Sequence, residues 1–232
     1  MKKISLLIIV ILVFGEQVLA QTVSSANKVL DESYDLSGKK FASNPNSGVE
    51  GSQMLNENWA TGVVQLTRGK IFSDALFQFN LVSQQLFIKK DTTVFAFTEQ
   101  VLAFTLNYQL KGVNRTVVFK NNYPPIEKQT NASFYQVLME GKKLDLLKFQ
   151  YKKAEERYEY NQPIKLVYQD MFDWYVFDRI HFRMIQIDNK LMGIQKILPD
   201  TSGKIYNSLQ PKNKKHLSEE EMLQLFKQLD QE

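Results

Sequence analysis

The stretch DMFDWYVFDRIHF, from Asp170 to Phe182, decides how the rest of the chain is interpreted, because it mixes aspartates and a histidine with large apolar side chains. In a strand, successive side chains point to opposite faces of the sheet. One face would then carry Phe172, Trp174, Val176 and Asp178, and the other Met171, Asp173, Tyr175 and Phe177. We interpret the stretch as one wall of a sheet with polar residues on its wetter face, rather than as a catalytic strand.

The aspartates of this stretch are poorly spaced for hydrolysis. Asp173 and Asp178 would point to opposite faces, and Asp170 and Asp178, which share a face, would be about 27 Å apart at the rise of a strand. The two carboxylates of a glycosidase lie within about 5–10 Å of each other. An envelope hydrolase would need carboxylates that converge from separate strands, for instance Asp74, Glu99 or Asp173, and this is the alternative hypothesis.

No metal site, cofactor or catalytic residue is predicted. The chain has two histidines, His181 and His216, and their separation gives no zinc-binding spacing. Phosphate-binding glycine loops and the serine motifs of hydrolases are missing. We expect Asp178 and Arg179 to lie at a strand end with their charges in water. A metal held by His181 and Asp178 is the weaker alternative.

Working outward, the sequence between Gly62 and Leu110 is dense in Val, Ile, Phe, Tyr and Thr and is interrupted every several residues by turn formers. Apolar segments this short are typical of strands. Two of them alternate with period two, around Phe77, Phe79 and Leu81, and around Leu102, Phe104, Leu106 and Tyr108. Such alternation predicts antiparallel strands with one buried face, and residues 113–119 continue the pattern.

Helices are predicted mainly near the C-terminus, from about residue 191 to 232. The last one has a capping box, Ser218 with Glu221, and an apolar stripe of Met222, Leu225, Phe226 and Leu229. Residues 133–141, SFYQVLMEG, are also expected to be a short helix, and residues 152–159, KKAEERYE, a charged turn between strands. The predicted fold class is α+β and β-rich: an antiparallel meander sheet, curved or partly closed, with short helices at the C-terminal end.

The N-terminus predicts export. Residues 1–20 combine Lys2 and Lys3 with an apolar run and small residues before Ala20, which is typical of a cleaved signal peptide. Residues 21–51 are rich in Ser, Asn, Gly and Lys, and we expect a mobile leader with a helical patch at 24–30. One domain, residues 52–232, would follow, with ordered structure from about Trp59. No later segment is apolar enough to span a membrane, so a periplasmic, cell-envelope or extracellular location is expected.

Composition narrows the classes of partner and chemistry. The chain has no cysteine, which excludes disulfides, thiol catalysis and thiolate metal sites. Removal of the signal peptide leaves 27 basic and 24 acidic residues, a net charge of +3 instead of +4. The lysines are scattered rather than gathered in a stripe, so no nucleic acid is expected as a partner.

Three stretches carry a resemblance: NWATGVVQLTRGKIFSDALFQFNLVSQQLFIKK at 58–90, SFYQVLMEGKKLDLL at 133–147 and KILPDTSGKIYNSL at 196–209, followed by the acidic start of the last helix. Their succession resembles a group of exported proteins of unknown function from Bacteroidetes-type bacteria and would cover most of residues 58–230. The resemblance implies a Gram-negative cell-envelope location. It implies no activity and no site residues.

The sequence therefore favours a non-catalytic exported protein that binds a ligand or a protein partner on its sheet. Its aromatic residues offer contact area rather than acid–base groups. A hydrophobic ligand would be expected in a dry pocket lined by Phe77, Phe79, Phe104 or Trp174. A third possibility is an assembly role in which the leader, residues 21–51, acts as a docking arm.

Overall fold

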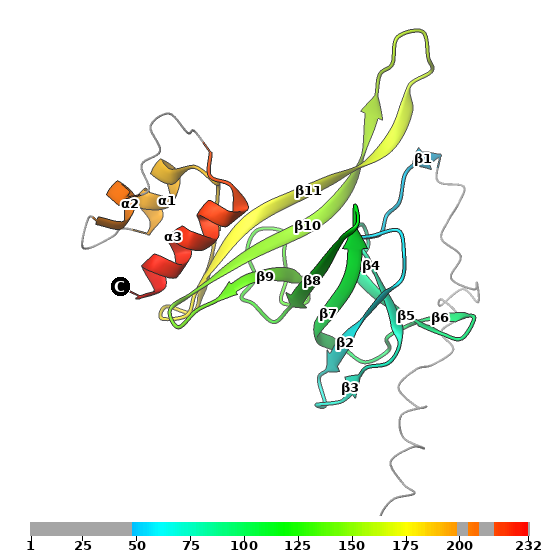
Figure 1. Cartoon of the computed structure of the whole chain (residues 1–232), viewed down its shortest axis with the longest axis horizontal. Helices are drawn as coiled ribbons and strands as arrows, with labels where there is room; N and C mark the ends of the chain where they lie inside the picture. Colours follow the sequence, from blue (N-terminus) through cyan, green and yellow to red (C-terminus); the bar gives the residue numbers. More distant parts are fainter. Residues whose placement is uncertain (1–47, 199–203, 209–215, 232) are drawn as a thin grey trace, which may run out of the picture.

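A computed structural model describes residues 48–198, 204–208 and 216–231 (Figure 1). As predicted, the fold is β-rich, with one sheet and short helices near the C-terminus; the sheet is mixed and not closed. The strands are β1 (Val49–Glu50), β2 (Ala60–Leu66), β3 (Ile71–Phe72), β4 (Leu76–Asn80), β5 (Gln85–Lys90), β6 (Thr93–Ala96), β7 (Val101–Leu110), β8 (Val113–Lys120), β9 (Tyr135–Glu140), β10 (Leu144–Arg157), β11 (Lys165–Asp178) and β12 (Arg183–Ile187). The helices are α1 (Leu191–Ile197), α2 (Lys204–Ser208) and α3 (Glu219–Gln231).

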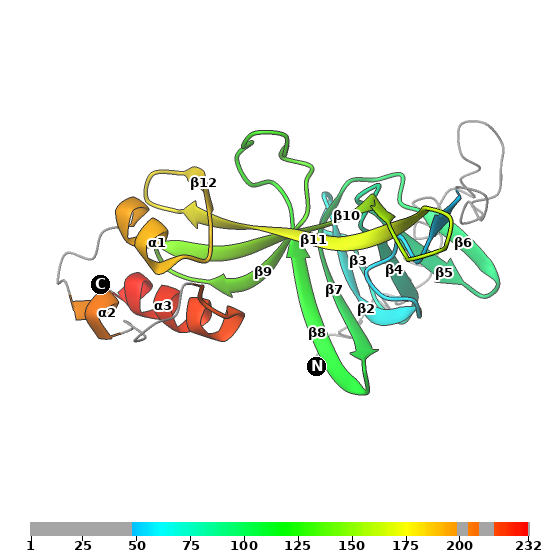
Figure 2. The same cartoon turned by 90° about the horizontal axis from the view of Figure 1, so that it is seen from above.

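The strands form a meander along most of the sheet. Their order is β1-β11-β10-β9-β8-β7-β2-β4-β5-β6, with β12 beside β11 and β3 beside β2. The pairing of β1 with β11 is parallel, and the other pairings are antiparallel. The N-terminal strands lie at one end of this sheet and the helices at the other (Figure 2). β10 and β11 run between the two ends.

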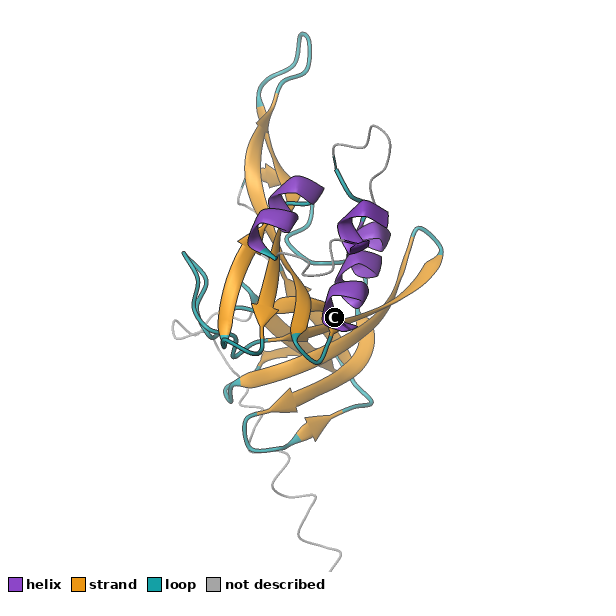
Figure 3. Ribbon diagram, turned by 90° about the vertical axis from the view of Figure 1, so that its left-hand side faces the viewer, coloured by secondary structure: helices purple, strands orange, loops and turns teal. Residues whose placement is uncertain are grey.

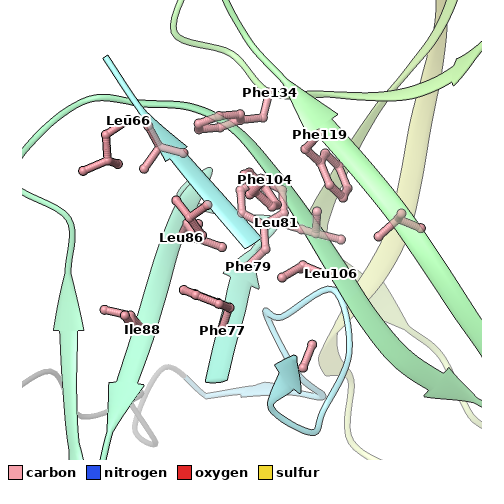
Figure 4. Close-up of a cluster of buried hydrophobic side chains, with 14 residues drawn as sticks. Leu66, Phe77, Phe79, Leu81, Leu86, Ile88, Phe104, Leu106, Phe119 and Phe134 are labelled. Atoms are coloured by element: carbon pink, nitrogen blue, oxygen red, sulfur yellow. The ribbon is translucent and has the colours of Figure 1, made fainter. Parts of the chain in front are cut away.

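The N-terminal strands enclose a phenylalanine core (Figure 4). The rings of Phe79, Phe104 and Phe119 lie with centroids 4.9–5.1 Å apart, and the ring of Phe134 packs against the first two. The period-two alternation predicted for β4 and β7 places the alternate residues Phe77, Phe79, Phe104 and Leu106 in the core, as expected. Asn80, expected on the wetter face, is buried too, because its side chain hydrogen-bonds Gln53 and the backbone of Val82.

The C-terminal part of the sheet is covered on both faces. Helices α1–α3 pack on one face and form the helix-side core, which includes Trp174, Val176, Ile194, Met222 and Phe226 (Figure 3). The opposite face carries the tyrosine core, which includes Tyr123, Tyr135, Phe149, Tyr175 and Phe177. The predicted strand at 170–178 is therefore confirmed, but its end, from Trp174 to Asp178, is buried on both faces rather than on one.

The helix predicted at residues 133–141 is wrong, because Tyr135–Glu140 form β9. Tyr135 and Val137 face the tyrosine core, whereas Leu138 and Met139 face the helix-side core. A strand buried on both faces loses the alternation of a half-exposed strand. A shift in the β9–β10 register opposite Leu138 breaks the period further, so the apolar spacing imitated that of a helix.

The C-terminal helix predictions are confirmed. The capping box of α3 is present: Ser218 N–H donates to the Glu221 carboxylate at 2.8 Å, and the Ser218 hydroxyl accepts from Glu221 N–H at 3.3 Å. The predicted apolar stripe of α3 is buried in the helix-side core.

The start of ordered structure lies before the predicted position near Trp59. Val49 and Glu50 already pair with β11, and Met54 bridges to Asn80. Tertiary pairing orders these residues, although their composition is that of a loop. The predicted signal peptide, the helical patch at 24–30 and the leader up to residue 47 lie outside the described residues.

Candidate functional site

The aromatic residues predicted to bind a ligand do not form one pocket. Phe77, Phe79 and Phe104 are closed inside the phenylalanine core, at most 2% exposed. Trp174 belongs to the helix-side core, a separate cluster. A ligand would reach the three phenylalanines only by opening the core of β2, β4 and β7.

The carboxylates that a hydrolase would require are engaged separately. Glu99 pairs with Lys70 at 3.2 Å, and Asp74 lies in an exposed turn beside Ser73. The Tyr151 hydroxyl donates a hydrogen bond to Asp173. Burial raises the pKa of Tyr151, and the nearby Asp173 carboxylate raises it further. Within the described part of the chain, no ion pair or hydrogen bond joins any two of Asp74, Glu99 and Asp173.

A charge network around the buried Asp145 links β8, the β9–β10 turn and the residue that follows β11. Arg179 Nε donates to Asp145 Oδ1 at 2.7 Å, and Nη2 donates to Asp145 Oδ2 and to Glu140 Oε1, both at 2.9 Å. Lys120 donates to Glu140 at 2.6 Å, and this hydrogen bond lowers the pKa of Glu140. Burial raises the pKa of Asp145, which is 1% exposed, and the guanidinium opposes that shift. Each carboxylate is held by basic groups of the protein, as in a structural ion-pair network.

The prediction that Asp178 lies in water is wrong. Its carboxylate is buried at the β11–β12 turn, where Oδ1 accepts the backbone N–H groups of Ile180 and His181 at 3.1 Å. Oδ2 accepts from Arg183 Nε at 3.1 Å and lies 2.7 Å from His181 Nδ1. Burial opposes ionisation, but these hydrogen bonds outweigh it and lower the pKa of Asp178. Sequence spacing shows the turn but not the convergence of donors on one carboxylate.

The described residues contain no group of three or more histidine, aspartate or glutamate side chains that could hold a metal ion. His181 is mostly exposed and its Nδ1 is engaged by Asp178. His216 is also exposed, with Nδ1 2.9 Å from Asn189 Oδ1. Neither histidine has a ligand set around it in the described part of the chain.

Exposed apolar side chains also lie on a two-stranded arm, residues 153–169, formed by the ends of β10 and β11 and their connection. The two strands stay in register from Leu144 opposite Asp178 to Arg157 opposite Lys165. In Figures 1 and 3 the arm projects beyond the body of the molecule and away from the helices. Only β1 pairs with it among the described strands, and Lys165 adds an ion pair to Glu50 at 2.8 Å.

The tip of this arm carries three large apolar side chains in solvent, Tyr158, Tyr160 and Ile164, with Tyr160 94% exposed. Leu166, in the paired part of the arm, is 40% exposed. Scattered exposed apolar residues are ordinary, but a gathering of them on a projecting element marks an interaction site. The arm also carries charged side chains that form exposed ion pairs, such as Arg157 with Glu159 at 3.0 Å. Its geometry is that of a contact surface.

Sequence reasoning missed the arm, because residues 152–159 were expected to be a turn. Lys, Glu and Ala are depleted in strands, so KKAEERYE has little local strand propensity. Pairing with β11 overrides that propensity: Lys152 lies opposite Asp170 and forms an ion pair with it at 3.3 Å. The available signal was the uninterrupted length of strand-like sequence on both sides of the charged run.

Comparisons with protein-family models, curated proteins and solved structures find no match. The resemblance to exported Bacteroidetes-type proteins therefore stays a prediction. Among the described residues, no helix is both long and apolar enough to cross a membrane.

Proposed function

We propose that the chain is a non-catalytic exported protein of the cell envelope that binds a protein partner through its β10–β11 arm. The observation that carries this proposal is the exposed apolar tip, Tyr158, Tyr160 and Ile164, on an element that stands clear of the body. Aromatic residues are enriched at the centres of protein interfaces, where they supply most of the binding energy.

A partner fits these features better than the alternatives. The rings expected to hold a hydrophobic ligand are enclosed in the core, and the carboxylates expected of a hydrolase are engaged in separate contacts. The buried acids Asp145 and Asp178 are saturated by donors from the protein. The exposed apolar tip of the arm is left as the feature best suited to contact another protein.

The cell-envelope location belongs to the proposal and rests on the sequence. Residues 1–20 have the pattern of a signal peptide, and the chain has no cysteine for lipid attachment or disulfides. A protein without disulfides must be held by its core, and three hydrophobic clusters supply one. Whether the partner is periplasmic or on the cell surface would follow from its identity.

A site-specific photo-crosslinker tests the proposal in the native host. The crosslinking residue replaces Tyr160 at the arm tip and, as a matched control, Ile71 in β3, which is also a large apolar residue and is 67% exposed. We expect a discrete covalent adduct with one envelope protein from position 160 and none from position 71. Equal labelling from both positions, or none from position 160, would contradict partner binding by the arm.

A substitution experiment separates binding from folding. The triple variant Tyr158→Ser, Tyr160→Ser and Ile164→Ser removes apolar surface that is already exposed, so its thermal unfolding should match that of the unmodified chain. A crosslinker at Leu166, which the variant retains, should lose its adduct in this background. An undiminished adduct in the folded variant would show that the tip side chains do not bind the partner.

A further inference from the structure

Strand β11 has an open segment on its outer edge. β1 pairs with Leu166 and Val167, and β12 pairs with β11 from Trp174 to Asp178. The residues that follow β1 lie beside Tyr168, since Gln53 Nε2 donates to its hydroxyl at 2.7 Å and Gly51 lies close to its backbone. Residues 169–173 therefore form the part of this edge that has no described strand beside it. At about 3.3 Å per residue the segment is about 16 Å long, which leaves room for an extended peptide of about five residues.

The register shows which backbone groups point outward. Arg179 N–H donates to the Lys143 carbonyl at 2.8 Å, and these residues extend the β10–β11 pairing by one position. Bonded and non-bonded pairs alternate in an antiparallel ladder. Odd-numbered residues of β11 therefore bond to β10, and Asp170 and Phe172 direct their N–H and C=O groups to the open edge.

We propose that residues 169–173 of β11 accept an extended segment of a partner protein as an added antiparallel strand between β1 and β12. This inference rests on the proposed partner binding and locates a second contact beside the arm. Edge strands with unpaired N–H and C=O groups pair readily with other chains, and strand addition is a common mode of peptide recognition. Asp170 and Phe172 would form about four main-chain hydrogen bonds with the added strand.

The side chains at the edge define the chemistry of the segment. Asp170 and Asp173 belong to the edge strand itself, one on each face, so an added strand would run beside both carboxylates. Lys152 pairs with Asp170 at 3.3 Å from the neighbouring strand, but the Asp170 side chain is still 81% exposed and open to a second cation. Phe172 lies between them, 50% exposed, with Lys148 Nζ 4.4 Å from its ring centroid. Read from its N-terminus, the partner segment should have a basic residue opposite Asp173, an apolar residue opposite Phe172, any residue, and a basic residue opposite Asp170.

A second copy of the chain cannot occupy this edge in the same way. Antiparallel pairing of two copies would place the β12 of one alongside the β1 of the other, since both strands lie on the outer edge of β11. Parallel pairing would place β12 against β12. Both arrangements force additional strands into a gap of about 4.8 Å, the spacing of paired strands. A separate extended segment has no such obstruction.

Synthetic peptides test the inference against the full chain as its host processes it. The probe is a fluorescein-labelled octapeptide, Thr-Thr-Lys-Val-Thr-Lys-Thr-Thr, measured by fluorescence anisotropy. One isomer is N-methylated at the valine and the second lysine, whose N–H groups would bond to β11. Its matched control is N-methylated at the first lysine and the central threonine, whose N–H groups would point away.

We expect the first isomer to bind at least tenfold more weakly than the parent, and the control to bind within about threefold of the parent. Asp170→Lys should weaken binding about two- to fivefold and strengthen binding of the glutamate-substituted peptide. Equal affinities of the two isomers would overturn strand addition. Affinities that Asp170→Lys leaves unchanged for both the lysine and the glutamate peptide would overturn the predicted basic pattern.

The same assay identifies the competing occupant from within the chain. If deletion of residues 21–47 raises the affinity for the parent peptide tenfold or more, the leader fills the edge and the partner proposal is wrong. Unchanged affinity supports a separate partner. Failure of peptide binding with an intact adduct at position 160 would refute the edge site alone, whereas loss of the adduct would refute the proposed function.

Discussion

Replacing Asp230 with asparagine should loosen the attachment of α3 to the sheet. The Asp230 carboxylate lies in the last turn of α3 and accepts three backbone N–H groups of the β9–β10 turn: Lys142 at 2.9 Å, Lys143 at 2.6 Å and Leu144 at 2.9 Å. The turn is closely fitted to it, because a side chain at Gly141 would place Cβ 2.4 Å from Asp230 Oδ1. This contact joins residues 86–88 positions apart in the sequence.

The magnitude follows from the number and charge of these hydrogen bonds. A hydrogen bond to a charged group contributes about 1.5–3 kcal/mol, less where water can replace it, and the bond from Lys142 is exposed. Asparagine keeps one acceptor oxygen but no charge, so we expect Asp230→Asn to lower the free energy of unfolding by about 1–2 kcal/mol. Asp230→Ala, which removes every acceptor, should lower it by about 2–4 kcal/mol.

The effect should depend on pH. Burial opposes ionisation of Asp230, but the three backbone hydrogen bonds outweigh it and hold the pKa below its ordinary value. The contribution is therefore complete above the unfolded-state pKa of about 4 and is lost as the pH falls through the lower folded-state pKa. The difference between the unmodified chain and Asp230→Asn should stay constant from about pH 8 to about pH 5 and shrink below about pH 4.

Urea unfolding followed by tryptophan fluorescence measures this difference, since Trp174 lies in the helix-side core against which α3 packs. Asp91→Asn is the matched control, because Asp91 is exposed in a turn with φ 55°, a conformation that asparagine also tolerates. The control should change stability by less than about 0.5 kcal/mol. An Asp230→Asn variant as stable as the control, with unchanged hydrogen exchange at Lys143 and Leu144, would refute the reasoning.

Two further substitutions probe the body of the fold. Arg179→Met leaves the buried Asp145 carboxylate without its guanidinium and should cost about 3 kcal/mol in urea unfolding. Arg183→Met should cost about 1 kcal/mol or less, because Arg183 is mostly exposed and Asp178 keeps His181 and two backbone N–H groups as partners; equal losses would contradict the dependence of Asp145 on Arg179. Gly62→Ala would place Cβ 1.9 Å from the Thr105 carbonyl oxygen and force β2 from β7, so the unfolding free energy should fall by about 1–3 kcal/mol; an unchanged melting temperature would show that the two strands separate without cost.

Where one face of an element is buried, the sequence was a good guide. The alternation around Phe79 and Phe104 predicted strands, and the stripe from Met222 to Leu229 predicted α3 with its capping box, because a half-buried strand or helix has a period that the sequence displays directly. The same reasoning predicted the strand from Asp170 to Asp178. These features depend on neighbours a few residues apart.

Where burial or pairing comes from distant segments, the sequence was misleading. β9 is covered on both faces and resembled a helix, and the charged arm resembled a turn because only its partner strand, β11, makes it extended. Two sets of hydrogen bonds also join residues far apart in the chain. Arg179 bonds to Asp145 and Glu140, and Asp230 accepts from the turn after β9.

The amino-acid sequence by itself determined the β-rich class, the C-terminal helices and the absence of thiol chemistry, because period and composition are local properties. Only the tertiary structure decided which acids are buried, that the predicted ligand-binding phenylalanines are core, and that an exposed arm and an open strand edge remain. The physical reason is that burial and strand pairing arise from contacts between segments far apart in the chain, and the local sequence of one segment does not show which other segment will lie beside it.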